Sequence, residues 1–211
     1  MSGFFHGVTT LLVDGGTRTI SLPSSSIIGL CDTFTPGLLG GGTAKAGELK
    51  LITSEREAIA AWGAGSAMAK AAAAIYVRAK AVIVGVGVPK LEDAALQTSA
   101  MIGGVLASGQ RTGLQALLDG KSVHNAQPKL LIAPGHSATQ AVATAMDALA
   151  GKLRAIAIVD GPNTTDEAVM AYAENFGSKR IYLVDPGVQF WDTVLSAAVD
   201  APASEIGRAQ V

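Results

Sequence analysis

Short runs of consecutive apolar residues recur along this chain, and each run ends in a turn that contains glycine or proline. They occupy residues 81–89, 129–135, 154–162 and 180–187. A run that is apolar at consecutive positions buries both of its faces, as strands do in a parallel sheet covered by helices. The last three runs recur about every 25 residues with helical sequence between them, which is the length of a βα unit. The pattern therefore predicts an α/β fold with a mainly parallel sheet and helices on both faces.

Helix-start signals lie between these runs. Ser54 with Glu57, Ser137 with Gln140, and Thr164 with Glu167 form capping boxes, in which a hydroxyl accepts from an orphan backbone N–H and the longer side chain reaches back. The segment from Phe190 onward has no clear pattern, although Pro202 and Ser204 are typical of a helix start. We expect helices over residues 54–63, 66–79, 91–107, 111–119, 138–151 and 165–176.

The first 35 residues differ from the remainder of the chain. Residues 7–14 and 17–22 read as two strands around an Asp-Gly-Gly turn, and residues 25–32 are a third candidate strand. Phe4 and Phe5 come before them. Such an extended arm either folds back on its own domain or is donated to the sheet edge of a neighbouring molecule.

Composition narrows the class of protein. The apolar fraction of 49% excludes disorder, and the charged fraction of 16% lies below the roughly 25% of typical globular proteins, which suits a surface covered by partners. The net charge is −1 with no basic cluster along the sequence, so we predict neither a nucleic-acid footprint nor a membrane patch. Cys31 stands alone, which excludes a disulfide framework. Without a signal-peptide pattern or a long apolar stretch, we expect a soluble, unexported chain.

Chemistry in such a sheet sits beyond the carboxyl ends of the strands. The sequence puts polar and turn residues there: Pro89, His136, Ser137, Asp160, Asn163 and Asp185. A nucleophile elbow would need a second glycine where Thr139 stands, and His136 lies directly beside Ser137, although a general base normally comes from a separate loop. Helix capping accounts for Ser137, and hydrogen bonds to their own turns account for the two aspartates. We predict no catalytic residues.

The spacing of possible metal ligands and of glycines along the sequence does not indicate a metal or cofactor site. Asp160 and Asp185 lack an evident third ligand, and His6, His124 and His136 have no zinc-binding spacing. The glycines at 85 and 87 lack the third glycine of a dinucleotide turn, and the triple glycine at 40–42 lacks the Lys-Ser or Lys-Thr of a phosphate loop. We expect no cofactor and no metal.

Extended stretches point to a specific family. They are Phe4–Val8, Asp14–Ile20, Ser26–Asp32, Arg111–Lys121, Gln127–His136, Lys152–Ala157, Tyr172–Lys179 and Asp185–Asp192. In this order they resemble contractile tail sheath proteins, the family of the R-type pyocin sheath and of contractile-tailed phages. The resemblance covers nearly the whole chain up to about Ser204.

This resemblance implies a structural subunit and no enzymatic activity. Sheath subunits polymerise as stacked hexameric rings around an inner tube and contract to drive the tube through a target envelope. The implied partners are other sheath subunits, the inner tail tube protein and the baseplate, with no nucleic acid and no membrane insertion. The implied location is the tail sheath of a virion or pyocin-like particle, after synthesis in the bacterial host cytoplasm.

The resemblance also divides the chain. Residues 1–24 match the N-terminal linking arm, residues 25–204 the α/β sheath domain, and residues 205–211 form a tail after which the family's C-terminal region is absent. We therefore expect this chain alone not to be competent for contraction. A small doubly wound hydrolase that uses Ser137 with Asp160 remains the alternative. The expected linking residues are Phe4, Phe5, Gly7, Val8, Leu11, Leu12, Val13, Thr17, Arg18 and Ile20.

Overall fold

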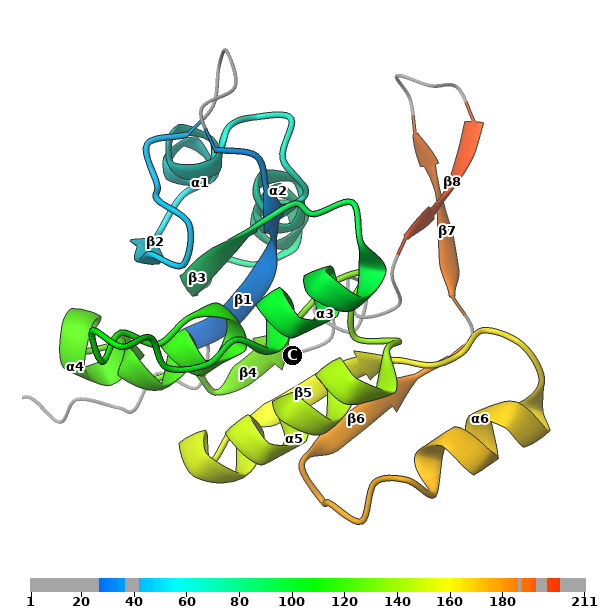
Figure 1. Cartoon of the computed structure of the whole chain (residues 1–211). Helices are drawn as coiled ribbons and strands as arrows, with labels where there is room; N and C mark the ends of the chain where they lie inside the picture. Colours follow the sequence, from blue (N-terminus) through cyan, green and yellow to red (C-terminus); the bar gives the residue numbers. More distant parts are fainter. Residues whose placement is uncertain (1–26, 37–41, 186, 193–196, 202–211) are drawn as a thin grey trace, which may run out of the picture.

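The computed structural model describes residues 27–36, 42–185, 187–192 and 197–201. A six-stranded sheet with the strand order β2-β3-β1-β4-β5-β6 lies at its centre (Figure 1). All neighbours in it are parallel except β2, which runs antiparallel to β3. The predicted parallel α/β sheet is confirmed, whereas β2 was not predicted. The strands are β1 (Ile27–Phe34), β2 (Leu49–Ile52), β3 (Val82–Pro89), β4 (Leu130–Ile132), β5 (Ile156–Asp160) and β6 (Ile181–Val184).

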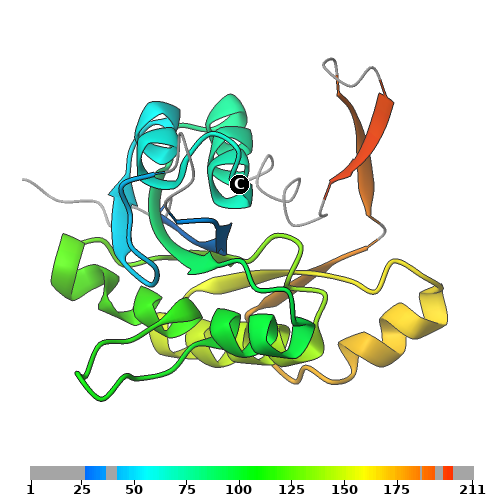
Figure 2. The same cartoon turned by 45° about the horizontal axis from the view of Figure 1, so that its top comes forward.

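Helices cover both faces of the sheet, as predicted, and Figure 2 shows the two layers on either side of it. On one face, Trp62, Met68 and Ile75 of the first two helices pack against the sheet in one buried cluster. On the other face, Met101 and Met146 belong to a second buried cluster, with residues of the 3-10 helix η1 between them. The helices are α1 (Glu55–Trp62), α2 (Ala67–Arg78), α3 (Ala94–Ile102), η1 (Gly113–Asp119), α4 (Gly120–His124), α5 (Gln140–Leu153) and α6 (Asp166–Ala173).

The three predicted helix starts have different outcomes. Ser54 caps α1 as predicted, since its Oγ accepts from the N–H of Glu57, although the Glu57 carboxylate accepts from the N–H of Thr53 at 2.7 Å. The cap at Thr164 is wrong by one position, because Thr165 accepts from the N–H of Ala168. The cap at Ser137 is also wrong. Helix α5 starts at Gln140, later than predicted, and the Ser137 side chain bonds elsewhere.

Helix α3 is shorter than the predicted 91–107. Asp93 caps its start by accepting from the N–H groups of Ala95 and Leu96. It ends at Ile102 because Gly103 adopts a φ of 70°, and a Cβ there would overlap the Thr112 carbonyl oxygen. The end of the helix is therefore set by a contact with a later loop, which no local signal announces.

A separate hairpin follows the sheet. Strands β7 (Val188–Asp192) and β8 (Ala197–Ala201) pair antiparallel with each other and stand apart from the six-stranded sheet (Figure 1). This hairpin was not predicted. The predicted N-terminal arm, with its linking residues from Phe4 to Ile20, lies outside the described residues, as does the possible helix start at Pro202. In the part that the structure does describe, no helix is long and apolar enough to cross a membrane.

Candidate functional site

The sheet topology singles out one crevice. From β1 the chain moves to β3 on one side and later crosses to β4 on the other, so the carboxyl ends of β1 and β4 form the topological switch point. Open α/β sheets commonly bind ligands at such a point. Asp32 lies near the carboxyl end of β1, and His136 and Ser137 lie in the turn that follows β4. Asp160 at the end of β5 completes this strand-end cluster.

The Ser137 hydroxyl forms two hydrogen bonds with Asp160. Its Oγ donates to Asp160 Oδ2 at 2.5 Å and accepts from the Asp160 N–H at 3.1 Å. Ser137 has no exposed surface and Asp160 is 7% exposed. The hydroxyl thus fastens the turn after β4 to the end of β5, and a substrate cannot reach it.

His136 faces a different carboxylate. Its Nε2 lies 3.7 Å from Asp32 Oδ1, and Asp32 also accepts from the N–H of Thr33 at 2.6 Å. Burial lowers the pKa of His136 below its ordinary value. Since the single hydroxyl hydrogen of Ser137 points to Asp160, His136 does not serve Ser137 as a general base. The strand-end cluster contains serine, histidine and aspartate without the geometry of a catalytic triad.

Asp185 and Asn163 join the next pair of loops. Asp185 Oδ1 accepts from the Asn163 N–H at 2.8 Å, and Asn163 Oδ1 accepts from the Gly187 N–H at 3.0 Å. Gly161 lies so close to Asp185 that an added Cβ would overlap its carboxylate. The expectation that Asp160 and Asp185 bond their own turns is therefore wrong, because each carboxylate contacts the neighbouring loop. Pro89 ends β3 in register with Phe34.

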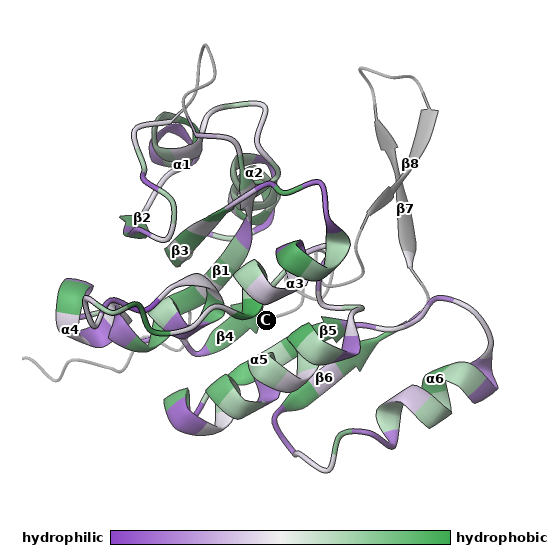
Figure 3. Ribbon diagram, viewed as in Figure 1, coloured by the Kyte–Doolittle hydropathy of each residue, from purple (hydrophilic) through white to green (hydrophobic). Residues whose placement is uncertain are grey.

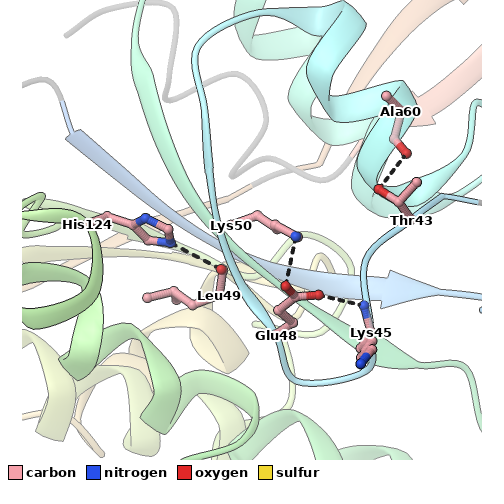
Figure 4. Close-up of polar contacts among 7 residues, drawn as sticks. All are labelled: Thr43, Lys45, Glu48, Leu49, Lys50, Ala60 and His124. Carbon is pink, nitrogen blue, oxygen red and sulfur yellow. Dashed lines mark hydrogen bonds and ion pairs between the residues drawn. The ribbon is translucent and has the colours of Figure 1, made fainter.

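A second polar region lies beside β2, the outermost strand of the sheet among the described residues (Figure 4). Glu48 accepts from the Lys45 N–H at 2.9 Å and pairs with Lys50 at 2.7 Å, while His124 Nε2 lies 3.1 Å from the Leu49 carbonyl oxygen. Beside them is an open hollow of about 350 Å³ that also contains the paired side chains of Arg111 and Asp119. The charges that line this hollow are thus already paired within the chain.

Metal ligands are not assembled in the region the structure covers. No group of three histidine, cysteine or carboxylate side chains comes together among the described residues, and His6 lies outside them. Asp32 was missed as a strand-end residue by the sequence reasoning. The signal was present, because it directly follows an apolar run, as Asp160 and Asp185 do.

These contacts define a layered α/β body in which the polar groups at the strand ends bind one another and hold loops in place. Comparison with known proteins gives the family. Residues 109–204 match the model of the phage tail sheath protein central domain. The chain is 65% identical over 201 residues to a putative prophage major tail sheath protein of Pseudomonas aeruginosa (strain UCBPP-PA14), covering 95% of this chain and 52% of that protein. It is 34% identical over 212 residues to the tail sheath protein of Escherichia phage P2, covering 97% and 52%.

Solved structures agree on the fold. A chain in the cryo-EM structure of the anti-feeding prophage baseplate in its contracted state matches with a TM-score of 0.63 at 14% identity, over 95% of this chain and 54% of that one. A chain of the contracted helical sheath of the same particle matches with a TM-score of 0.55 at 15% identity, over 99% and 51%. The resemblance to the phage tail sheath protein family is therefore confirmed, and the chain spans about half the length of the relatives it matches.

Proposed function

We propose that this chain is a structural subunit of a contractile tail sheath and has no enzymatic activity. The observation that carries the proposal is the 65% identity to a prophage major tail sheath protein over 95% of the chain. In this role its copies polymerise as stacked hexameric rings around an inner tube, contact a baseplate, and contract to drive the tube through a target envelope. The protein resides in the tail sheath of a phage or prophage particle.

The strand-end cluster supports this role over the hydrolase alternative. Ser137 is inaccessible, and both its donor and its acceptor bonds go to Asp160. A subunit that transmits force between neighbours needs loops that are fixed to the sheet, and the Ser137–Asp160 and Asn163–Asp185 contacts provide such fixing. These bonds make the body rigid at the point where an enzyme would need an open crevice.

In the proposal residues 1–24 form a linking arm between subunits, residues 25–204 the α/β body, and residues 205–211 a tail. Main-chain pairing suits such a link, because an added strand binds directionally to an open sheet edge. The β7–β8 hairpin offers such edges, since within the described residues each of its strands pairs only with the other. A two-stranded hairpin alone is marginally stable in water, so it would gain from a further strand.

Removal of the arm tests the proposal. The full chain and a variant that lacks residues 1–22 are compared by sedimentation velocity and circular dichroism, and a variant that lacks residues 205–211 is the matched control. We expect association to be lost only in the first variant, while both variants keep the melting transition of the body. A full chain that stays monomeric, or unchanged association without the arm, would contradict the arm as the link.

A further inference from the structure

Cationic side chains gather at the amino-terminal edge of β4, β5 and β6. Lys129 precedes β4, Arg154 precedes β5 and Arg180 precedes β6. The three loops are tied together, because the Ile156 N–H donates to the Lys129 carbonyl oxygen and the Ala157 N–H to the Arg180 carbonyl oxygen, both at 2.8 Å. Neighbouring strands lie about 4.8 Å apart, so these residues enter three successive strands at the same end of the sheet. With Lys152 at the end of α5 and Lys179 beside Arg180, they form what we call the basic edge: Lys129, Lys152, Arg154, Lys179 and Arg180.

Among the described residues, no ion pair involves a side chain of the basic edge. Its contacts there are to main-chain oxygens: Lys129 Nζ lies 3.3 Å from the Leu153 carbonyl and Arg180 Nη1 lies 3.5 Å from the Ala155 carbonyl. The ion pairs between described residues involve the cations Lys50 and Arg111, and His136 lies beside Asp32. Lys152, Arg154 and Lys179 are exposed. Like charges held together repel one another, so this edge favours contact with an anionic surface.

The opposite ends of β5 and β6 are acidic. Asp166 and Glu167, both exposed, open the helix that follows β5, and Asp185 follows β6. The intervening loop residues, from Gly161 to Thr165 and at Pro186 and Gly187, include no cation. We call Asp166, Glu167 and Asp185 the acidic edge. Figure 3 shows the two hydrophilic ends, with one at the end of α5 and the loop before β6 and the other at the first turn of α6.

We propose that the basic edge of one copy of this chain docks on the acidic edge of a second copy. This inference rests on the proposed function as a polymerising subunit. Strands of four and five residues separate the two edges by roughly 15 Å, so the two charged surfaces are distinct and point away from each other. A contact between two different surfaces of identical molecules is heterologous, and its repetition generates rings or helical arrays. This is the kind of contact that a stacked assembly needs.

These cations form no cluster along the sequence because they lie in three separate segments of it. The βα repeat brings them together, since each repeat returns the chain to the same edge of the sheet. An alternative anionic partner, such as a nucleic acid, would occupy the basic edge without any need for the acidic one, and the experiment separates the two cases.

Charge reversal at each edge tests the contact. One variant of the full chain carries Arg154→Glu and Lys179→Glu, a second carries Asp166→Lys and Glu167→Lys, and a third carries all four changes. Arg56→Glu with Lys70→Glu, exposed on α1 and α2, makes the same change in charge elsewhere and is the control. Sedimentation equilibrium in low and high salt measures association, and melting curves show that each variant folds.

We expect each single-edge variant to associate at least tenfold more weakly than the parent in low salt, and the two variants to associate with each other when mixed. The four-change variant should recover the parent's association, while the control should match the parent. A parent chain that is monomeric, single-edge variants that associate normally, or a four-change variant that stays weak would each overturn the inference. If charge reversal has no effect while loss of residues 1–22 abolishes association, the edge contact is refuted and the sheath role stands.

Discussion

Replacement of Ser137 with alanine measures how strongly the strand-end cluster holds the fold together. The substitution removes the hydroxyl that donates to the Asp160 carboxylate and accepts from the Asp160 N–H. A hydrogen bond to a charged group contributes about 1.5–3 kcal/mol, and a buried N–H left without an acceptor costs about 1 kcal/mol or more. Because Asp160 is nearly inaccessible, water replaces these bonds poorly. We therefore expect Ser137→Ala to lower the free energy of unfolding by about 3 kcal/mol, more than the roughly 1 kcal/mol of a lost helix cap.

The assay is urea unfolding followed by circular dichroism, together with thermal melting. For a domain of this size, about 3 kcal/mol corresponds to a fall in Tm of roughly 6–12 °C. Ser99→Ala is the matched control, because Ser99 is exposed on α3. A loss below 1 kcal/mol at Ser137, or an equal loss at Ser99, would refute the reasoning that the buried serine–aspartate contact stabilises the turn.

Further predictions concern the backbone, pH and the thiol. Gly103→Ala should destabilise the protein by about 3 kcal/mol or more in urea unfolding, because φ is 70° and the new Cβ would overlap the Thr112 carbonyl, whereas Gly104→Ala, with open space around it, should change little. Burial lowers the pKa of His136 in the folded state, so the imidazole binds a proton more readily in the unfolded chain than in the folded one. The contribution of His136 to the free energy of unfolding is therefore complete above the ordinary pKa of 6.5 and is lost as the pH falls below it. His136→Asn should flatten that part of a stability–pH profile, and an unchanged slope would contradict the assignment. Burial, with the nearby Asp32 carboxylate as a second cause, raises the pKa of the Cys31 thiol far above its ordinary range, so Cys31 should react with a thiol reagent only at the rate of unfolding. Rapid labelling in native buffer would show that β1 opens locally.

Much of the fold follows from local sequence because its signals are local. The continuous apolar runs predicted β3, β4, β5 and β6. Most residues of β3, β4 and β5 are buried between helices and need no alternation, whereas β6 at the end of the sheet is only partly buried. Strand β2 was not predicted because it has only four residues and a lysine interrupts its apolar positions. The sequence there is neither a continuous apolar run nor a clear alternation. Hairpin β7–β8 was not predicted because the sequence after Phe190 contains no Asn-Gly or Asp-Gly turn signal.

The strand-end contacts could not be predicted from local sequence because they join residues far apart in the chain. The sequence around Ser137 matches a capping box, and nothing local points to another partner. Only the pairing of β4 with β5 shows that Asp160 lies beside Ser137. The same holds for Asp185, whose partner Asn163 lies in the previous loop. Hydrogen bonds of this kind depend on which strands are neighbours, and a single sequence predicts strands more reliably than their order.

The charged residues of the βα repeats recur at similar places relative to the strands. If the βα repeats are aligned on their strands, Lys129 and Arg180 lie one residue before β4 and β6, and Arg154 lies two residues before β5. At the other end, Asp160 is the last residue of β5 and Asp185 directly follows β6. In a parallel sheet the first position always lies at one edge and the second at the opposite edge, whatever the strand order. The β5 and β6 repeats keep cations before their strands and carboxylates at or after them, so the opposite charges that the proposed contact between copies requires follow from the repeat itself.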